Sequence, residues 1–111
     1  MFKQFDVCWF DLNPTEGAEI RKTRPCVIIS PDILNKHLKT VIVAPLTSRG
    51  FEYKFRVKTH LDKKEGLIVI DQMCAIDKNR IVKNYGKNGK EGRISESEIL
   101  ELKDKLQEMF A

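Results

Sequence analysis

The sequence contains few of the residues on which most catalytic and metal sites depend. It has two histidines and three cysteines in 111 residues. Cys8, Cys26 and Cys74 are odd in number and form no C-x-x-C pair, which argues against both a disulfide framework and a zinc site. His37 and His60 lie near lysines or turn residues, with no Ser-His-Asp or Cys-His signature around them. We therefore expect Cys8 and Cys26 in the core, surface histidines, and no metal or cofactor.

Long apolar runs and low-complexity segments are also absent. Apolar runs such as 41–45 and 66–70 are far below the roughly 18 residues that a membrane span needs. The first six residues lack the apolar stretch of a signal peptide. With 41% hydrophobic and 32% charged residues, the composition predicts one folded domain over residues 1–111, located in the cytoplasm and without membrane contact.

Positive charge is abundant and unevenly distributed. Twenty Lys and Arg against sixteen Asp and Glu give a net charge of +4. Acidic residues concentrate between Glu91 and Glu108. The basic residues of the first half are Arg21, Lys22, Arg24, Arg49, Lys54, Arg56 and Lys58. One surface should therefore be cationic and suited to an anionic partner.

Hydrophobic periodicity predicts a small β structure. Alternation over residues 5–10 is typical of a strand with one buried face. Alternation over 51–58 predicts a strand that shows a charged face to water. Other strands are expected at 26–30, 40–44, 66–71 and 80–83, with a turn at 73–77.

One helix is predicted, at the C-terminal end. Ser95 and Glu98 form a capping-box sequence, in which each side chain can bind a free amide at a helix start. Apolar residues then recur at spacings of three and four: Ile99, Leu102, Leu106 and Met109. This spacing predicts an amphipathic helix of about 15 residues that packs on the sheet. The fold class is therefore mainly β with a C-terminal helix, arranged as a small, strongly curved β-barrel.

Arg24 is the strongest candidate for chemistry. It precedes Pro25, which disfavours helix and holds the arginine extended where a polar segment enters its strand. A guanidinium fixed in this way presents a planar fork of donors that suits phosphate oxygens. Two interpretations are open, because the same arginine could instead pair with Glu16 or Glu19 at the surface.

A second polar point follows the strand at 40–44. The predicted strand ends at Pro45, which places Thr47, Ser48 and Arg49 at its end. Hydroxyl groups there could bind a phosphate or a ribose, or could cap a turn. Both interpretations remain open.

Several short motifs in one order resemble the MazF/PemK (Kid) family of toxin endoribonucleases. They are Asp11-Leu12-Asn13-Pro14-Thr15, Gly17, Glu19, Arg24-Pro25, Ala44-Pro45-Leu46-Thr47-Ser48, Gly66, Asp71-Gln72, Ile76-Asp77 and Arg80. The resemblance covers nearly the whole chain, from Phe5 through the final helix. It implies an SH3-like β-barrel and a homodimer.

The resemblance also implies a function. Such enzymes, called mRNA interferases, cut single-stranded RNA at short sequences without a metal, by attack of a ribose 2'-OH that leaves a 2',3'-cyclic phosphate and a 5'-OH. The catalytic arginine and threonine of the family fall on Arg24 and Thr47, and its acidic residue falls on Glu19. Arg24 would stabilise charge or give a proton to the leaving oxygen, Thr47 would orient the reacting groups, and Glu19 would orient Arg24 or accept a proton.

RNA and a protein inhibitor are the partners that the resemblance implies. The inhibitor is a MazE-like antitoxin, whose acidic, disordered segment would cover the cationic groove. The residues expected to bind RNA are Arg21, Lys22, Ser48, Arg49, Asp77 and Arg80. For Asp77, capping a turn is an equal alternative. Phe51, Tyr53 and Phe55 could stack on RNA bases, but they fit the core and the dimer contact better.

Cys74 departs from the family pattern. The family often has a basic residue at this position, two residues after Asp71-Gln72, and a neutral thiol cannot replace a cation. Arg49, Lys78 or Arg80 would then have to supply the charge, or specificity and rate would differ.

Two other functions fit parts of the pattern. Cys74 is compatible with a barrel that binds RNA without cutting it. A gyrase poison similar to the CcdB toxins would share the barrel and the dimer, but its end usually carries a tryptophan motif. This chain ends Gln107-Glu-Met-Phe-Ala111, and its only tryptophan is Trp9.

Overall fold

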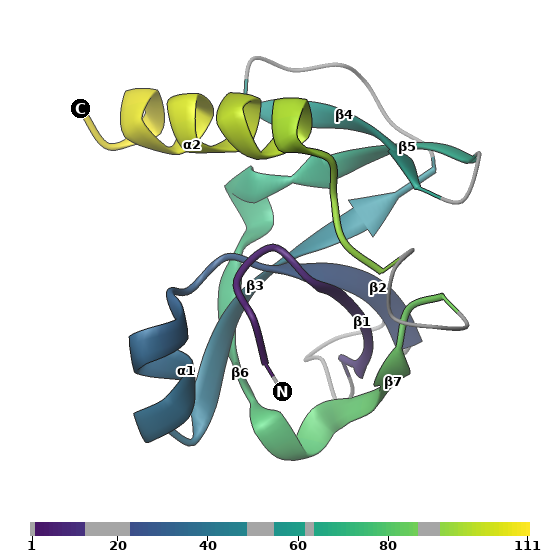
Figure 1. The fold of residues 1–111 in the computed structure, drawn as a ribbon, viewed down its shortest axis with the longest axis vertical. Helices are drawn as coiled ribbons and strands as arrows, with labels where there is room; N and C mark the ends of the chain where they lie inside the picture. Colours follow the sequence, from purple (N-terminus) through teal and green to yellow (C-terminus); the bar gives the residue numbers. More distant parts are fainter. Residues whose placement is uncertain (1, 13–22, 49–54, 62–63, 87–91) are drawn as a thin grey trace.

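Seven strands of the described chain join in one antiparallel sheet (Figure 1). The computed structural model describes residues 2–12, 23–48, 55–61, 64–86 and 92–111. The strands are β1 (Val7–Asp11), β2 (Thr23–Ile28), β3 (Thr40–Thr47), β4 (Arg56–Leu61), β5 (Lys64–Val69), β6 (Cys74–Asp77) and β7 (Ile81–Asn84). The helices are α1 (Asp32–His37) and α2 (Glu96–Met109), with single 3₁₀ turns η1 (Ile70–Gln72) and η2 (Lys78–Arg80).

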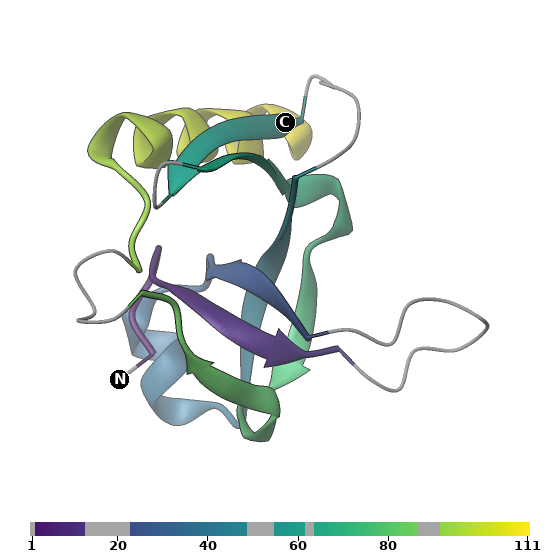
Figure 2. The same cartoon turned by 90° about the vertical axis from the view of Figure 1, so that its right-hand side faces the viewer.

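The sheet curls around β3, which changes partners along its length. Strand order is β4-β5-β3-β2-β1-β7, and β6 pairs with β3 as well. Figure 2 shows β4 and β5 beneath α2, with β1, β2 and β7 on the other side of the curl. The mainly β fold with a C-terminal helix is confirmed. The curvature matches the predicted barrel, but no pairing joins β4 to β7, so the described sheet is not closed.

Two hydrophobic clusters cover both faces of β1. Val7 belongs to the cluster beneath α2, whereas Cys8 and Phe10 belong to a second cluster with Cys26. The expectation of one buried face was therefore wrong, because the short curled sheet encloses β1 from two sides. Trp9 stays half-buried at the margin. The predicted burial of the two cysteines is confirmed.

The predicted cap and apolar stripe of α2 are confirmed. The Ser95 hydroxyl accepts the Glu98 N–H at 3.2 Å, and a Glu98 carboxylate oxygen accepts the Ser95 N–H at 3.0 Å. Ile99 and Leu102 are buried in the cluster beneath the helix, and Leu106 and Met109 pack against it. No helix among the described residues has the length and apolar character to cross a membrane.

Three predicted boundaries were wrong because strand pairing, rather than the local pattern, sets where the strands run. The expected turn at 73–77 is largely β6, in which Val43 pairs with Cys74 and Thr40 with Asp77. β3 does not break at Pro45 but runs to Thr47, because its end joins β5. Of the strand expected at 51–58, residues 51–54 lie outside the described part, and β4 runs on to Leu61.

Helix α1 was not predicted, and buried polar side chains anchor it. Asn35 is 3% exposed; its amide donates to the Ser30 carbonyl at 2.9 Å and to the Phe2 carbonyl at 3.2 Å. The Ser30 hydroxyl donates to Asn35 Oδ1 at 2.5 Å and accepts the Ile42 N–H at 3.0 Å. Lys78 Nζ donates to the Asn35 carbonyl, which ties η2 to the same helix.

Candidate functional site

Pro25 of β2 and Pro45 of β3 lie where the pairing of these two strands ends and the site opens. The β2–β3 register runs from Ile28↔Val43 to Cys26↔Pro45 and stops there. Neither proline has an N–H to continue a ladder. Beyond this point, among the described strands, Arg24 pairs with Phe10 of β1, and Thr47 pairs with Leu67 of β5. The two strands therefore diverge with Arg24 and Thr47 at corresponding positions.

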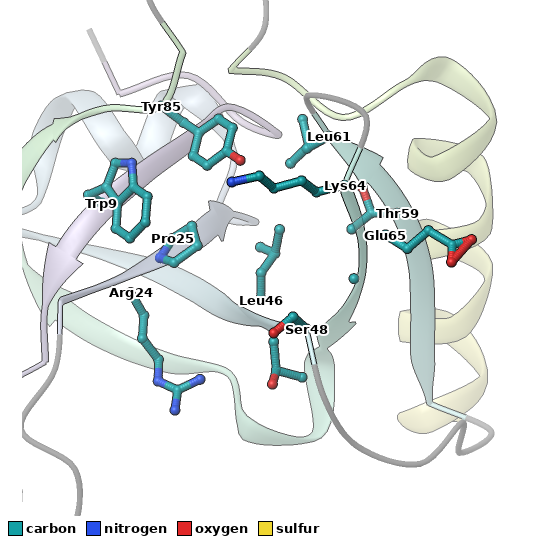
Figure 3. A pocket seen from close by; sticks show the side chains of 12 residues that line it. Trp9, Arg24, Pro25, Leu46, Ser48, Thr59, Leu61, Lys64, Glu65 and Tyr85 are labelled. Carbon is teal, nitrogen blue, oxygen red and sulfur yellow. The ribbon is translucent and has the colours of Figure 1, made fainter.

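Three adjoining cavities form a groove along this divergence. A cavity of about 350 Å³ is lined by Arg24 and Thr47 together with Arg56 and Gln72. Arg24 and Thr47 also line a neighbouring cavity of about 710 Å³ (Figure 3). Gln72 continues on the other side into a third cavity, of about 530 Å³. The predicted catalytic arginine and threonine thus lie together, at the junction of the first two cavities.

Arg24 lies in β2, where its backbone is extended, as the following proline favours. It is half-buried in β2. Within the part of the chain that the structure describes, no carboxylate pairs with its guanidinium. Figure 3 shows Arg24 at one end of the large cavity, near Ser48, with Tyr85 at the opposite end. A cation that faces an open groove is the arrangement expected of an anion-binding group.

The remaining described candidates lie on both sides of this junction. Ser48 lines the large cavity beside Thr47. Asp77 and Arg80 line the third cavity, with Cys74. The Asp77 carboxylate accepts the Asn79 N–H at 2.9 Å and so caps η2, and Arg80 Nη1 donates to the Asp11 carbonyl at 3.4 Å. Both side chains therefore already have structural roles.

Four predicted site residues lie outside the described residues: Glu19, Arg21, Lys22 and Arg49. So do Phe51 and Tyr53, whereas Phe55 packs against the cluster beneath α2.

Sequence reasoning missed Arg56 as a groove residue. Alternation placed it on a face toward water, yet its side chain is only 13% exposed. Its Nε lies 3.3 Å from Asp71 Oδ1. The ion pair joins β4 to η1 and could not be read from local spacing.

A pair of aromatic side chains was also missed. Trp9 of β1 and Tyr85, just after β7, stack with ring centroids 5.8 Å apart and planes inclined by 16°. Both line the large cavity. The two residues are far apart in sequence, and only the pairing of β1 with β7 brings them together. The one signal in the sequence was Trp9 itself, a large aromatic residue in a strand between Cys8 and Phe10.

Comparison with known proteins identifies the family. Residues 3–110 match the model of the PemK-like, MazF-like toxins of type II toxin-antitoxin systems. The chain belongs to this family. A curated relative, Endoribonuclease MazF of Staphylococcus saprophyticus, is 37% identical over 87 residues, which span 73% of this chain and 72% of the relative. The predicted family and the enzyme class, an endoribonuclease, are confirmed by these matches.

Solved structures of PemK/MazF toxins share the fold. MazF from Deinococcus radiodurans superposes with a TM-score of 0.77 at 22% identity, covering 97% of this chain and 94% of that one. A mycobacterial endoribonuclease solved with its cognate antitoxin gives a TM-score of 0.78 at 16% identity, covering 97% and 93%. At these identities the likeness supports the fold alone.

Cys74, the residue at which the resemblance predicts a departure from the family pattern, begins β6. The residue is exposed at the third cavity, but neighbouring atoms shield its thiol from part of the solvent, and this desolvation raises the pKa of the thiol. Burial raises the pKa of Cys26 to about 12 and that of Cys8 to about 11. All three thiols are therefore neutral near pH 7, and none supplies charge or a thiolate nucleophile.

Proposed function

We propose that this PemK/MazF toxin cuts single-stranded RNA at a short sequence without a metal, through attack of the ribose 2'-OH on the neighbouring phosphate. One observation carries the proposal: Arg24 and Thr47 line two adjoining cavities from the diverging ends of β2 and β3. A guanidinium and a hydroxyl at the middle of a groove, with room on either side, suit a phosphodiester whose flanking nucleotides extend both ways.

The reaction is a transesterification. The 2'-OH loses its proton and its oxygen bonds to phosphorus, while the bond from phosphorus to the 5'-oxygen breaks. The 5'-oxygen takes a proton and leaves as a 5'-OH, and the other fragment keeps a 2',3'-cyclic phosphate. Glu19, outside the described residues, is the proposed group that accepts the proton or orients Arg24.

Arg24 stabilises the charge that grows on the phosphoryl oxygens. A preorganised donor of this kind is worth about 3 kcal/mol in the transition state. Thr47 orients the phosphate or the attacking hydroxyl. Gly66 lets β5 approach Thr47 closely, since a Cβ on Gly66 would lie 3.1 Å from the Thr47 carbonyl oxygen. Because an arginine supplies the positive charge, the mechanism does not require a metal ion.

RNA binding extends along the groove. Ser48 would hold the strand in the large cavity, and Asp77 and Arg80 in the third cavity. Arg21, Lys22 and Arg49 are proposed to add phosphate contacts from segments that the structure does not describe. Arg80, which lines the same cavity as Cys74, is the proposed replacement for the cation that the family often has there.

We further propose a cognate MazE-like antitoxin and a homodimer in the cytoplasm. Relatives solved as a MazE-MazF complex and with a cognate antitoxin support the first partner. Exposed apolar side chains on α1, Ile33 at 62% and Leu34 at 41%, support a protein interface on this chain.

The test is cleavage of a long RNA by the purified protein in EDTA, with mapping of the cut ends. We expect cuts at one short sequence, 2',3'-cyclic phosphate and 5'-OH ends, and little or no cleavage by Arg24→Ala. Loss of cleavage in EDTA would contradict metal independence. RNA that is bound but left intact by the folded wild-type chain would favour the non-catalytic RNA-binding function.

A further inference from the structure

The large cavity has a wall that phosphate chemistry does not explain. Besides Arg24 and Thr47, it is lined by the stacked rings of Trp9 and Tyr85 and by the apolar side chains of Pro25 and Leu46. Its volume of about 710 Å³ lies within the range of pockets that enclose a small molecule. An aromatic and aliphatic wall does not bind a phosphate, so it must serve another part of the ligand.

Backbone contacts fix the segments that carry the two rings. Trp9 pairs with Lys83 across β1 and β7, and the Tyr85 N–H donates to the Val7 carbonyl at 3.1 Å. Gly92 lies against the other side of this segment, where a Cβ would come within 2.4 Å of the Tyr85 carbonyl oxygen. The positions from which the two rings stack are therefore set by the sheet itself.

Two lysines add positive charge beside the rings. Lys83 Nζ lies 6.0 Å from the centroid of the Trp9 ring. Figure 3 shows Lys64 reaching across the cavity toward Tyr85 and Trp9, away from Arg24. Fixed aromatic rings flanked by cations are the usual elements of a site for single-stranded nucleic acid, because bases stack on rings and phosphates pair with lysines.

We propose that this cavity is a nucleobase site, in which the Trp9–Tyr85 wall stacks against the base of a nucleotide directly beside the cleaved phosphate. The inference rests on the proposed function, since the adjoining Arg24 is what would place the phosphate. Lys64 and Lys83 bind the next phosphate along the strand. The site helps to select which phosphate reaches Arg24, because a nucleotide without its base fills the cavity poorly.

Trp9 itself is the probe for the test, because it is the only tryptophan of the chain. The ligand is a short single-stranded RNA with the mapped cleavage sequence, 2'-O-methylated so that it cannot be cut. We expect saturable quenching of Trp9 emission on titration into the wild-type protein. Unchanged emission at saturating RNA, with binding verified by anisotropy, would overturn the proposal. This measurement needs no variant and therefore no assumption about folding.

A second measurement locates the base. In a series of the same strand with one base removed at a time, we expect one position beside the cleaved bond to weaken binding about 10- to 100-fold. The same removal should have little effect in Tyr85→Leu, whose affinity for the intact strand is already reduced. Phe110→Leu, at an aromatic residue that is 70% exposed on the last turn of the chain, is the matched control and should behave as wild type.

The outcomes separate the two proposals. An equal penalty in wild type and Tyr85→Leu would refute the base site while leaving cleavage intact. A folded wild-type chain that cuts no RNA would instead refute the proposed function. Quenching by an acidic antitoxin peptide but not by RNA would reassign the cavity to the protein partner and overturn the nucleobase assignment.

Discussion

The two ends of β2 show how differently polar residues are used beside one strand. Beyond one end, the side chains of Ser30 and Asn35 are buried and form hydrogen bonds with each other and with nearby backbone groups. At the other end, Arg24 and Thr47 line cavities. Buried polar groups that are satisfied internally stabilise a fold, whereas a cation held at an open groove can act on a ligand. Substitutions at the two ends should therefore change different quantities.

The largest expected effect is at the groove end. Arg24→Lys keeps the positive charge but loses the planar fork of donors, so we expect RNA cleavage to fall about 100- to 1,000-fold. The free energy of unfolding should change by less than about 0.5 kcal/mol, because Arg24 has no described ion pair to lose. Single-turnover cleavage and urea unfolding measure the two quantities.

The matched control is Arg93→Lys. Arg93 pairs with Asp6 at 3.2 Å, away from the three cavities. Its replacement should leave the cleavage rate unchanged. If Arg24→Lys kept most of the wild-type rate, or if it unfolded the protein, the contrast between the two ends of β2 would fail.

At the other end, Asn35→Ala should lower stability and spare cleavage. The change removes two donated hydrogen bonds and leaves the buried Ser30 hydroxyl without its acceptor. We expect the free energy of unfolding to fall by about 2–3 kcal/mol. The folded fraction should cut RNA at the wild-type rate. Asn79→Ala, at an exposed asparagine whose described contact is through its backbone N–H, should cost less than about 0.5 kcal/mol.

Glu98 combines both cases, because it stabilises the fold and also contacts a residue that lines the groove. Its carboxylate caps α2 and also accepts from the Thr59 hydroxyl at 3.1 Å and the His60 N–H at 2.9 Å. Thr59 is 1% exposed and lines the large cavity. Glu98→Ala should cost about 2 kcal/mol of stability. Cleavage should fall far less than in Arg24→Lys, because the effect on the groove is indirect.

Glu101→Ala, at an exposed residue of the same helix, is the control. Both variants can be compared by urea unfolding and by cleavage at a temperature where each is folded. Equal stabilities of the two variants would show that the contacts from Glu98 to β4 contribute little.

Local chemistry explains which parts of this molecule could be predicted from sequence. The cap and stripe of α2 and the extended Arg24-Pro25 step depend on neighbours in the chain, and each is found as expected. The role of Arg24 stays a prediction. β6 depends on pairing with β3, and the Trp9–Tyr85 stack depends on pairing between β1 and β7. Such contacts leave almost no local signal, so both were missed.

Arg56 shows the same limit within one strand. Alternation predicts correctly that Val57 is buried and Lys58 is exposed. It cannot show that Asp71 comes close enough to cover Arg56. Helix α1 was missed for a different reason, since six residues are too few for a clear periodicity and buried side chains hold it.

The smallest expected effect concerns Cys26, which lies in β2 between the two ends. Burial, with a further contribution from nearby Cys74, raises the pKa of the Cys26 thiol from 9.0 to about 12. Above pH 9 the unfolded chain loses this proton while the folded chain keeps it, so stability falls as pH rises from about 9 toward 12. Cys26→Ala removes this dependence, although it lowers stability at every pH by leaving a small cavity.

Urea unfolding at pH 8, 9 and 10 measures the difference. Above pH 9, the free energy of unfolding should fall more steeply in wild type than in Cys26→Ala, by at most about 1.4 kcal/mol per pH unit. Cys74→Ala is the control; because that thiol is exposed at the third cavity, its removal should change the slope less. Parallel pH profiles for wild type and Cys26→Ala would mean that water reaches Cys26, and the last pair of the β2–β3 ladder, Cys26↔Pro45, would then be open.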